Sequence, residues 1–234
     1  MRAPRVLIAG AVAAMSLTLA ACVPGEPEPT PTTAESPDPS PEPTPEPTVE
    51  IDPHPDLADL IISTSGLGPL TVGLPPATNP GAAMIEWDPD FCSLDEEIMG
   101  PIDEPGRWVA AGYDTDSNYM GEPARALYID ADDDGVYRID VMGYSPHTAE
   151  GIRIGATLDE LQATYPALQG PHDNTISQVW WLQDANGTVV FETQGEDMLG
   201  AGNPEQVILI RVLAAGIDPA WGAANSGNVA GACF

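Results

Sequence analysis

The stretch SQVWWLQDANGTVVFET, residues 177–193, decides the fold. Two runs rich in β-branched and aromatic residues, 177–183 and 188–193, flank the pair Asn186-Gly187. Such runs are typical of strands, and Asn-Gly between them is a strong signal for the two-residue turn of a hairpin. The stretch therefore predicts two antiparallel strands.

Alternation about this turn also predicts which side chains share a face. Counting outward, Leu182 lies opposite Phe191, and Trp180 is on their side, which is the core face. Trp181 then points to the other face, together with Val190. If one face packs against the rest of the domain, we expect the other face to be open.

Further strand-like runs continue the pattern along the chain. The segment 132–135, three aspartates and a glycine, predicts a hairpin turn between two of them. The predicted strands are 206–213 near the C-terminus and 108–113, 125–130 and 136–142 earlier in the chain.

The sequence of the domain predicts two copies of one structural unit. The openings 65–73 and 148–155 each carry an apolar pair and end at a glycine, which predicts a short strand in each. A helix follows each opening in this interpretation. The second is well marked by a capping box from Thr157 to Glu160, and the first is placed at 80–86.

These elements predict an α+β fold: two tandem helix-plus-strand repeats, about 57–143 and about 144–234, forming one antiparallel sheet with helices on one face. The paired openings resemble exported bacterial proteins of the β-lactamase-inhibitor-protein type, which implies the same tandem architecture. The chain departs from that type because its one candidate disulfide spans both units, so the resemblance is used for architecture and not for inhibition.

The N-terminal region is typical of an export signal. Arg2 and Arg5 precede an apolar run, 6–21, that is short for a membrane span. Leu19-Ala20-Ala21-Cys22 resembles the bacterial lipobox, here of an actinobacterial-type lipoprotein, which implies acylation of Cys22 and a signal peptide of 1–21. An ordinary signal peptide cleaved near Ala21, or an uncleaved anchor, is the alternative.

Residues 22–56 are predicted to be a lipidated cysteine followed by a tether. Of the 34 residues in 23–56, twelve are proline and nine are acidic, with no lysine or arginine. Proline lacks an amide donor and fixes φ, so the segment is predicted to be disordered and close to polyproline II. The globular domain is 57–234, and the whole is expected at the cell membrane with this domain on the extracytoplasmic side.

The charge excludes one class of partner. The chain has seven arginines, no lysine and 36 acidic residues, for a net charge of −29. Such a chain repels nucleic acid and anionic headgroups. The expected partners are the membrane, through the N-terminal lipid, and an extracytoplasmic protein or peptide.

Two cysteines remain once Cys22 carries the lipid. In an exported protein, Cys92 and Cys233 are most simply a disulfide that ties the end of the chain to the first third of the domain. The alternative is two free buried thiols.

The second sheet face supplies the candidate binding residues. Aromatic residues and arginine anchor many protein interfaces. The alternative is that Trp181 packs under a loop and meets no partner. The predicted partner-binding residues are Tyr128, Arg138, Trp181, Leu209 and Arg211.

Metal and cofactor motifs are weak. Asp130, Asp132 and Asp134 have the opening spacing of a calcium loop, but Val141 stands where an EF-hand needs a glutamate. An Asp-rich hairpin turn explains the pattern, and a surface calcium site is the alternative. No cofactor is predicted.

Function is therefore expected to be binding. The chain is interpreted as a lipid-anchored exported interaction module that uses the open sheet face. The alternatives are a cell-wall hydrolase with carboxylates that the sequence does not identify, and a purely structural envelope lipoprotein. Whether the chain is an enzyme is left undecided, since any two acids can meet in space.

Overall fold

The computed structural model describes residues 52–93, 100, 102, 104–113, 116–117, 121, 123–174, 176–220, 229–231 and 233. The chain divides into the units Met1–Pro47 and Thr48–Phe234, and every described residue belongs to the second. The predicted signal, Cys22 and most of the predicted tether lie outside the described residues.

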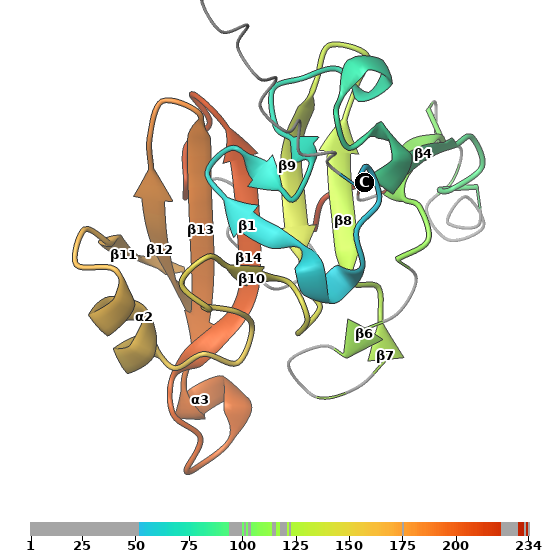
Figure 1. Cartoon of the computed structure of the whole chain (residues 1–234). Helices are drawn as coiled ribbons and strands as arrows, with labels where there is room; N and C mark the ends of the chain where they lie inside the picture. The colour runs from blue at the N-terminus through green and yellow to red at the C-terminus, as the bar shows by residue number, and fades with distance from the viewer. Residues whose placement is uncertain are drawn as a thin grey trace, which may run out of the picture. The chain divides into compact units, whose positions relative to one another are not determined.

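A six-stranded antiparallel sheet forms the centre of the domain, in the order β11-β12-β13-β14-β9-β8 (Figure 1). Strands from both halves of the sequence join where β14 pairs with β9, for example at Val212 and Ile139. The strands are β8 Leu127–Ala131, β9 Val136–Val141, β11 Gln169–Asn174, β12 Ser177–Gln183, β13 Gly187–Gln194 and β14 Gln206–Ala214.

The hairpin of β12 and β13 forms as predicted, but its register differs. Trp180 pairs with Phe191 and Leu182 with Val189, so the predicted pairing of Leu182 with Phe191 is wrong by two residues. The N–H of Asp184 donates to the Gly187 carbonyl at 3.0 Å and closes the turn one residue earlier than predicted. Because side chains alternate with a period of two, a slip of two leaves both face assignments unchanged.

The predicted Asp-rich turn joins β8 to β9. The N–H of Asp132 donates to the Gly135 carbonyl at 3.1 Å. One oxygen of the Asp132 carboxylate also accepts hydrogen bonds from the N–H groups of Asp134 and Gly135. Aspartate favours such turns because its side chain satisfies backbone donors two or three residues ahead.

The predicted α+β repeat is wrong. The fold is mostly strand, 39% against 13% helix. The described residues contain two α-helices, α2 Leu158–Thr164 and α3 Glu196–Leu199. The expected strand at 152–154 is not a strand, and the expected helix at 80–86 is replaced by the 3-10 turn η3 Ala82–Met84 and strand β4 Ile85–Asp88.

The missing helix has a local cause. Asn79 binds the short strand β3, Leu70–Thr71: its side chain accepts from the Thr71 N–H at 3.0 Å and donates to the Thr71 carbonyl at 2.7 Å. Gly81 lies against Leu70, where an added Cβ would be 2.5 Å from the Leu70 nitrogen. The chain is therefore held in a turn, and only the alternating run beyond Met84 is left to form β4.

Smaller elements surround the large sheet. A four-stranded sheet has the order β10-β1-β2-β3, and β10 is parallel to β1. Two ribbons, β4-β5 and β6-β7, complete the strands. Their bounds are β1 Ile61–Ser63, β2 Gly66–Leu67, β3 Leu70–Thr71, β5 Arg107–Ala110, β6 Asp116–Ser117, β7 Pro123–Ala124 and β10 His147–Thr148, with 3-10 turns η1 Leu57–Asp59 and η2 Pro76–Thr78.

The main core lies between the large sheet and the four-stranded sheet, which covers its front in Figure 1. Phe191, Ile139 and Ile210 project from the large sheet and are fully buried with Leu60 and Leu67. Each such side chain contributes about 1.5–3 kcal/mol when it is removed from water. Helix α2 joins this core through the fully buried Leu161.

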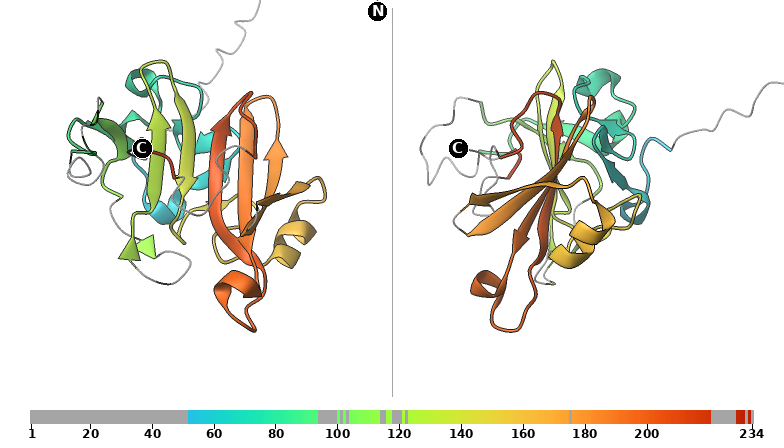
Figure 2. Two further views of the ribbon diagram at one scale, coloured as in Figure 1. Left: turned by 180° about the vertical axis from the view of Figure 1, so that it is seen from behind. Right: turned by 90° about the vertical axis from the view of Figure 1, so that its left-hand side faces the viewer.

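The second face of the large sheet is also covered, by residues near the end of the chain. Val179, Val190 and Leu213 form a small apolar cluster against which Trp181 and Ile217 pack. Figure 2 shows the C-terminal residues, in dark red, over β8 when the molecule is seen from behind. The expected open face is therefore covered in part.

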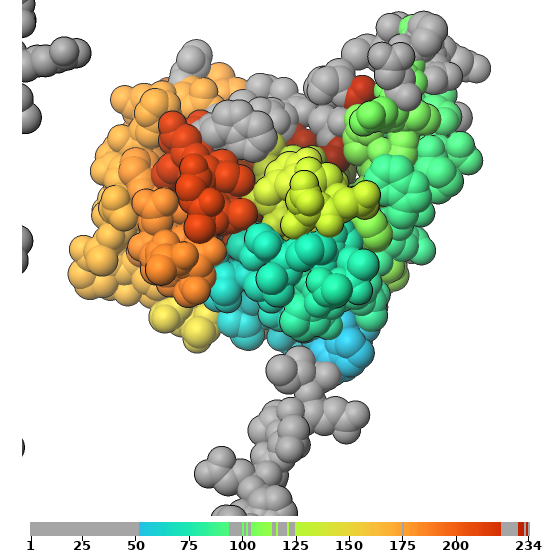
Figure 3. All heavy atoms as spheres, turned by 90° about the horizontal axis from the view of Figure 1, so that it is seen from above, coloured from blue at the N-terminus to red at the C-terminus, as the bar shows by residue number. Residues whose placement is uncertain are grey.

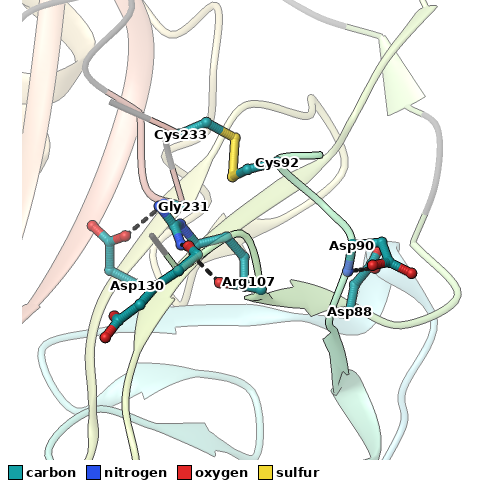
Figure 4. Close-up of a disulfide and its surroundings, with 9 residues drawn as sticks. Asp88, Asp90, Cys92, Arg107, Asp130, Gly231 and Cys233 are labelled. Carbon is teal, nitrogen blue, oxygen red and sulfur yellow. Dashed lines mark hydrogen bonds between the residues drawn. A yellow bond between two sulfur atoms is a disulfide. The ribbon is translucent and has the colours of Figure 1, made fainter. Parts of the chain in front are cut away.

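The predicted disulfide is confirmed. Cys92 and Cys233 are bonded with their Cα atoms 5.4 Å apart, across a sequence separation of 141 residues (Figure 4). The bond holds the end of the chain beside the ribbon β4-β5 and strand β8.

A search of the described residues for a membrane-spanning helix finds no candidate.

At one edge of the large sheet, β11 is exposed along nearly its whole length. It contains Pro171, which has no N–H to offer a further strand. Its register against β12 also shifts between Gln169 and His172.

Candidate functional site

The predicted partner-binding residues do not form an exposed surface. Arg138, Leu209 and Arg211 are only 1%, 3% and 1% exposed. Tyr128 and Trp181 are half-buried. The expectation that these side chains meet solvent is wrong for the first three. Arg138 and Arg211 are enclosed in the ion pairs described next.

Asp140 is the centre of a buried ion-pair cluster on this face. Its carboxylate accepts hydrogen bonds from Nε of Arg138 at 3.0 Å and from Nε of Arg211 at 2.7 Å. A terminal nitrogen of Arg138 donates to its second oxygen at 2.7 Å. Asp130 lies 3.7 Å from another terminal nitrogen of Arg138. Two arginines and two aspartates thus balance, which allows charges to be buried.

The same two aspartates bind the end of the chain. The N–H of Ala230 donates to Asp140 at 2.9 Å, and the N–H of Gly231 donates to Asp130. Figure 4 shows this second bond beside the disulfide that holds Cys233. The cluster is therefore occupied within the protein: it fastens the C-terminal residues to the sheet and leaves no charge for a ligand.

A groove on the other side of Asp130 is the best candidate site. It has a volume of about 1040 Å³. It lies where the ribbon β4-β5 meets the β8–β9 hairpin; in Figure 3 the ribbon region is green and the hairpin yellow-green. Its aromatic lining is Trp87, Trp108 and Tyr137, and its charged lining is Glu104, Arg107, Asp130, Asp132 and Asp133.

Trp87 and Trp108 form an aromatic wall. They are direct cross-strand partners in β4 and β5, and their ring centroids are 5.8 Å apart at an interplanar angle of 66°. This edge-to-face arrangement is favourable for aromatic pairs. Trp87 is 52% exposed, more than the other large apolar side chains that the described residues expose.

Gly106 allows the Trp87 ring to take this position. A Cβ atom at residue 106 would lie 2.1 Å from Cζ2 of Trp87, far inside van der Waals contact. Any larger residue would displace the indole ring. The ring is thus seated by the backbone of the loop before β5, and about half of the residue's surface remains exposed to solvent.

The carboxylates of the groove differ in their surroundings. Asp132 and Asp133 are exposed on the hairpin turn, and Glu104 is exposed on the loop before β5. Asp130 is half-buried, and this burial raises the pKa of its carboxyl group above the ordinary value. The hydrogen bond from Gly231 and the charge of Arg138 act in the opposite direction but are smaller effects. Arg107 donates to the carbonyls of Glu104 and Gly106 at 2.6 and 2.7 Å.

Two of the three aspartates that suggested a calcium loop accept hydrogen bonds from the backbone. Asp132 closes the hairpin turn, and Asp130 accepts from Gly231. Within the part of the chain that the structure describes, no group of three or more histidine, cysteine or acidic side chains is placed to hold a metal ion. The hairpin turn alone accounts for the spacing of Asp130, Asp132 and Asp134.

No protein-family model matches this chain, and neither the curated proteins nor the solved structures gave a match. The chemistry of the groove itself therefore indicates what this protein can bind. An exposed indole, a second tryptophan and several carboxylates can bind a ligand that has both a flat or apolar part and a positive or hydrogen-donating part.

The sequence analysis missed this groove, although it contained a signal. Trp87 lies in Ile85-Glu86-Trp87-Asp88, where apolar and polar residues alternate as in a strand. The predicted helix, 80–86, takes in the first two of these residues, and no strand is predicted here, so Trp87 is not paired with Trp108. Recognising two strands with a tryptophan in each would have indicated an aromatic pair.

Proposed function

We propose that this chain is an exported, lipid-anchored binding protein that takes its ligand in the groove at Trp87. The observation that carries the proposal is the half-exposed indole of Trp87, held against Gly106 and Trp108 in the lining of the groove. Exposing an indole to water is unfavourable, and large exposed aromatics at a concave site are typical of ligand recognition.

Binding is favoured over hydrolysis by the state of Asp130. A glycosidase needs two carboxyl groups facing each other across the scissile bond, one of them with a raised pKa. Asp130 has a raised pKa, but its oxygens already face the Gly231 N–H and the Arg138 guanidinium. A group so engaged is poorly placed to donate a proton to a substrate.

The binding proposal is tested with the indole N–H resonances of the isotopically labelled full-length chain in detergent. The ligands are a blocked arginine tripeptide, a blocked glutamate tripeptide, chitotriose and soluble cell-wall muropeptides. We expect at least one to shift the Trp87 and Trp108 signals. Trp180 is the internal control, because its Nε1 donates to Thr193 at 3.2 Å inside the protein. If no ligand moves Trp87, or if Trp180 moves equally, the proposal is wrong.

The anchor is the second part of the proposal, and it is supported by the sequence Leu19-Ala20-Ala21-Cys22 after an apolar run. A diacylglyceryl group at Cys22 supplies the two chains needed for stable membrane attachment. In cells fed a labelled fatty acid, we expect the wild type to carry the label and to sediment with membranes. Cys22→Ser should lose the label; membrane retention of this variant equal to that of the wild type would contradict the anchor.

A further inference from the structure

The charge of the groove limits what it can bind. Asp130 is balanced within the ion-pair cluster, which leaves Glu104, Asp132 and Asp133 against Arg107 in the lining. These three carboxylates and one guanidinium give a net charge of −2, on a chain whose net charge is −29. The field of such a protein attracts cations and repels anions over several ångströms.

The aromatic wall narrows the class of cationic ligand further. Tryptophan is the best of the aromatic side chains at binding a cation over its ring, and guanidinium groups are the most frequent partners. Guanidinium is planar, so it can stack on the indole and still donate hydrogen bonds to carboxylates in its own plane. Trp87, Asp132 and Asp133 all line this groove, so it offers these two kinds of contact together.

We infer that the groove binds an arginine-bearing segment of a polypeptide, with a guanidinium stacked on Trp87 and paired with the carboxylates of the β8–β9 turn. This inference rests on the proposed binding function and adds the class of ligand. A neutral glycan would also stack on an indole, but it would gain nothing from the surplus negative charge.

The test uses the same full-length chain and compares the blocked arginine tripeptide with the glutamate tripeptide and chitotriose. We expect the arginine tripeptide to bind with the highest affinity, shifting the Trp87 and Trp108 indole signals. Binding should weaken as salt is raised from 50 to 500 mM, because exposed charge pairs are screened. The glutamate tripeptide should not bind.

Two variants remove the two kinds of contact. Trp87→Ala should weaken arginine-tripeptide binding about 2- to 30-fold, the range that corresponds to a cation–π contribution of about 0.5–2 kcal/mol. Asp133→Asn should weaken binding and reduce its salt dependence. Matched controls come from α3 beyond β13, where Met198 is 51% exposed and Asp197 is exposed: Met198→Ala and Asp197→Asn should leave the affinity unchanged.

The outcomes distinguish a wrong inference about the ligand class from a wrong proposal about the binding function. If chitotriose or muropeptides shift Trp87 and the arginine tripeptide does not, the groove remains a binding site and the inference about arginine is overturned. If Trp87→Ala does not weaken tripeptide binding, or if Asp197→Asn weakens it as much as Asp133→Asn does, attraction is general and the inference is again overturned. If none of the ligands shifts Trp87, the proposed function fails with it.

Discussion

Asp140 shows how one residue can reverse the meaning of a sequence pattern. In β9 and β14, Arg138, Asp140 and Arg211 occupy the polar positions of an alternating strand, which normally indicate an exposed face. Here they are at most 1% exposed. Alternation reports only that a position is not apolar, and it does not distinguish a side chain in water from one in an ion pair. For that reason the sequence predicted the correct face but the wrong environment.

The free energy of unfolding of the protein should depend strongly on Asp140. Asp140→Asn removes the charge that both buried guanidiniums contact. Breaking a buried pair in this way costs about 3–5 kcal/mol. We expect a loss of this size in the free energy of unfolding from urea titration. The exposed Asp133→Asn is the control and should change it by less than about 0.5 kcal/mol; equal effects would show that the burial argument is wrong.

Among the elements, helix α2 is the one whose sequence signal was sufficient by itself. Thr157 Oγ1 accepts from the Glu160 N–H at 3.2 Å, and the Glu160 carboxylate accepts from the Thr157 N–H at 2.8 Å, as the capping box predicted. These contacts are local, so four residues of sequence specify them. Packing of Leu161 into the core then fixes the helix in place.

The cap can be measured independently of packing. Thr157→Ala leaves the Glu160 N–H without its side-chain acceptor, and we expect it to lower the free energy of unfolding by about 1 kcal/mol. Thr157→Ser keeps the hydroxyl and should retain most of the stability. Urea unfolding of both variants provides the measurement, and a serine variant as unstable as the alanine variant would indicate that the methyl group matters instead.

The other elements show where local signals end. The hairpin of β12 and β13 was predicted with its faces correct, because the period of two tolerates an even error in register. The helix expected at 80–86 failed because Asn79 and Gly81 bind to β3, an interaction that nothing in the segment itself reveals. Propensity decides a short segment only where tertiary contacts do not.

At the scale of the molecule, the groove depends on contacts that are distant in sequence. Its lining comes from β4, the loop before β5, and the β8–β9 hairpin, and no periodicity relates these segments. The covering of the second sheet face likewise comes from the end of the chain, whose small residues carry no alternating pattern. The disulfide was predictable because counting cysteines needs no geometry, whereas the groove was not.

The disulfide should contribute to the whole domain and most of all to the C-terminal residues. On the chain-entropy argument, closing a loop of 141 residues stabilises the protein by up to roughly 5 kcal/mol. We expect the double variant Cys92→Ser with Cys233→Ser to unfold at lower urea. Amide exchange at Ala230 and Gly231 should also accelerate more than exchange at Ile210 in the centre of the sheet.

The wild type, in which the bridge is intact, is the reference for this measurement. The result would contradict the argument if the double variant were as stable as the wild type. It would also do so if Ala230 and Gly231 kept their protection, because the hydrogen bonds to Asp140 and Asp130 would then hold the C-terminal residues without the bridge.

The exposed edge strand of the large sheet matters when many copies of this protein are crowded together. Strand β11 carries Pro171 and an irregular register, and both discourage a neighbouring molecule from adding its own strand. Copies attached to one membrane, as proposed here, share a thin layer and collide far more often than free molecules would. An edge strand that disfavours further strand pairing lets these copies stay crowded without polymerising into fibrils. Each copy then keeps its own groove free to bind.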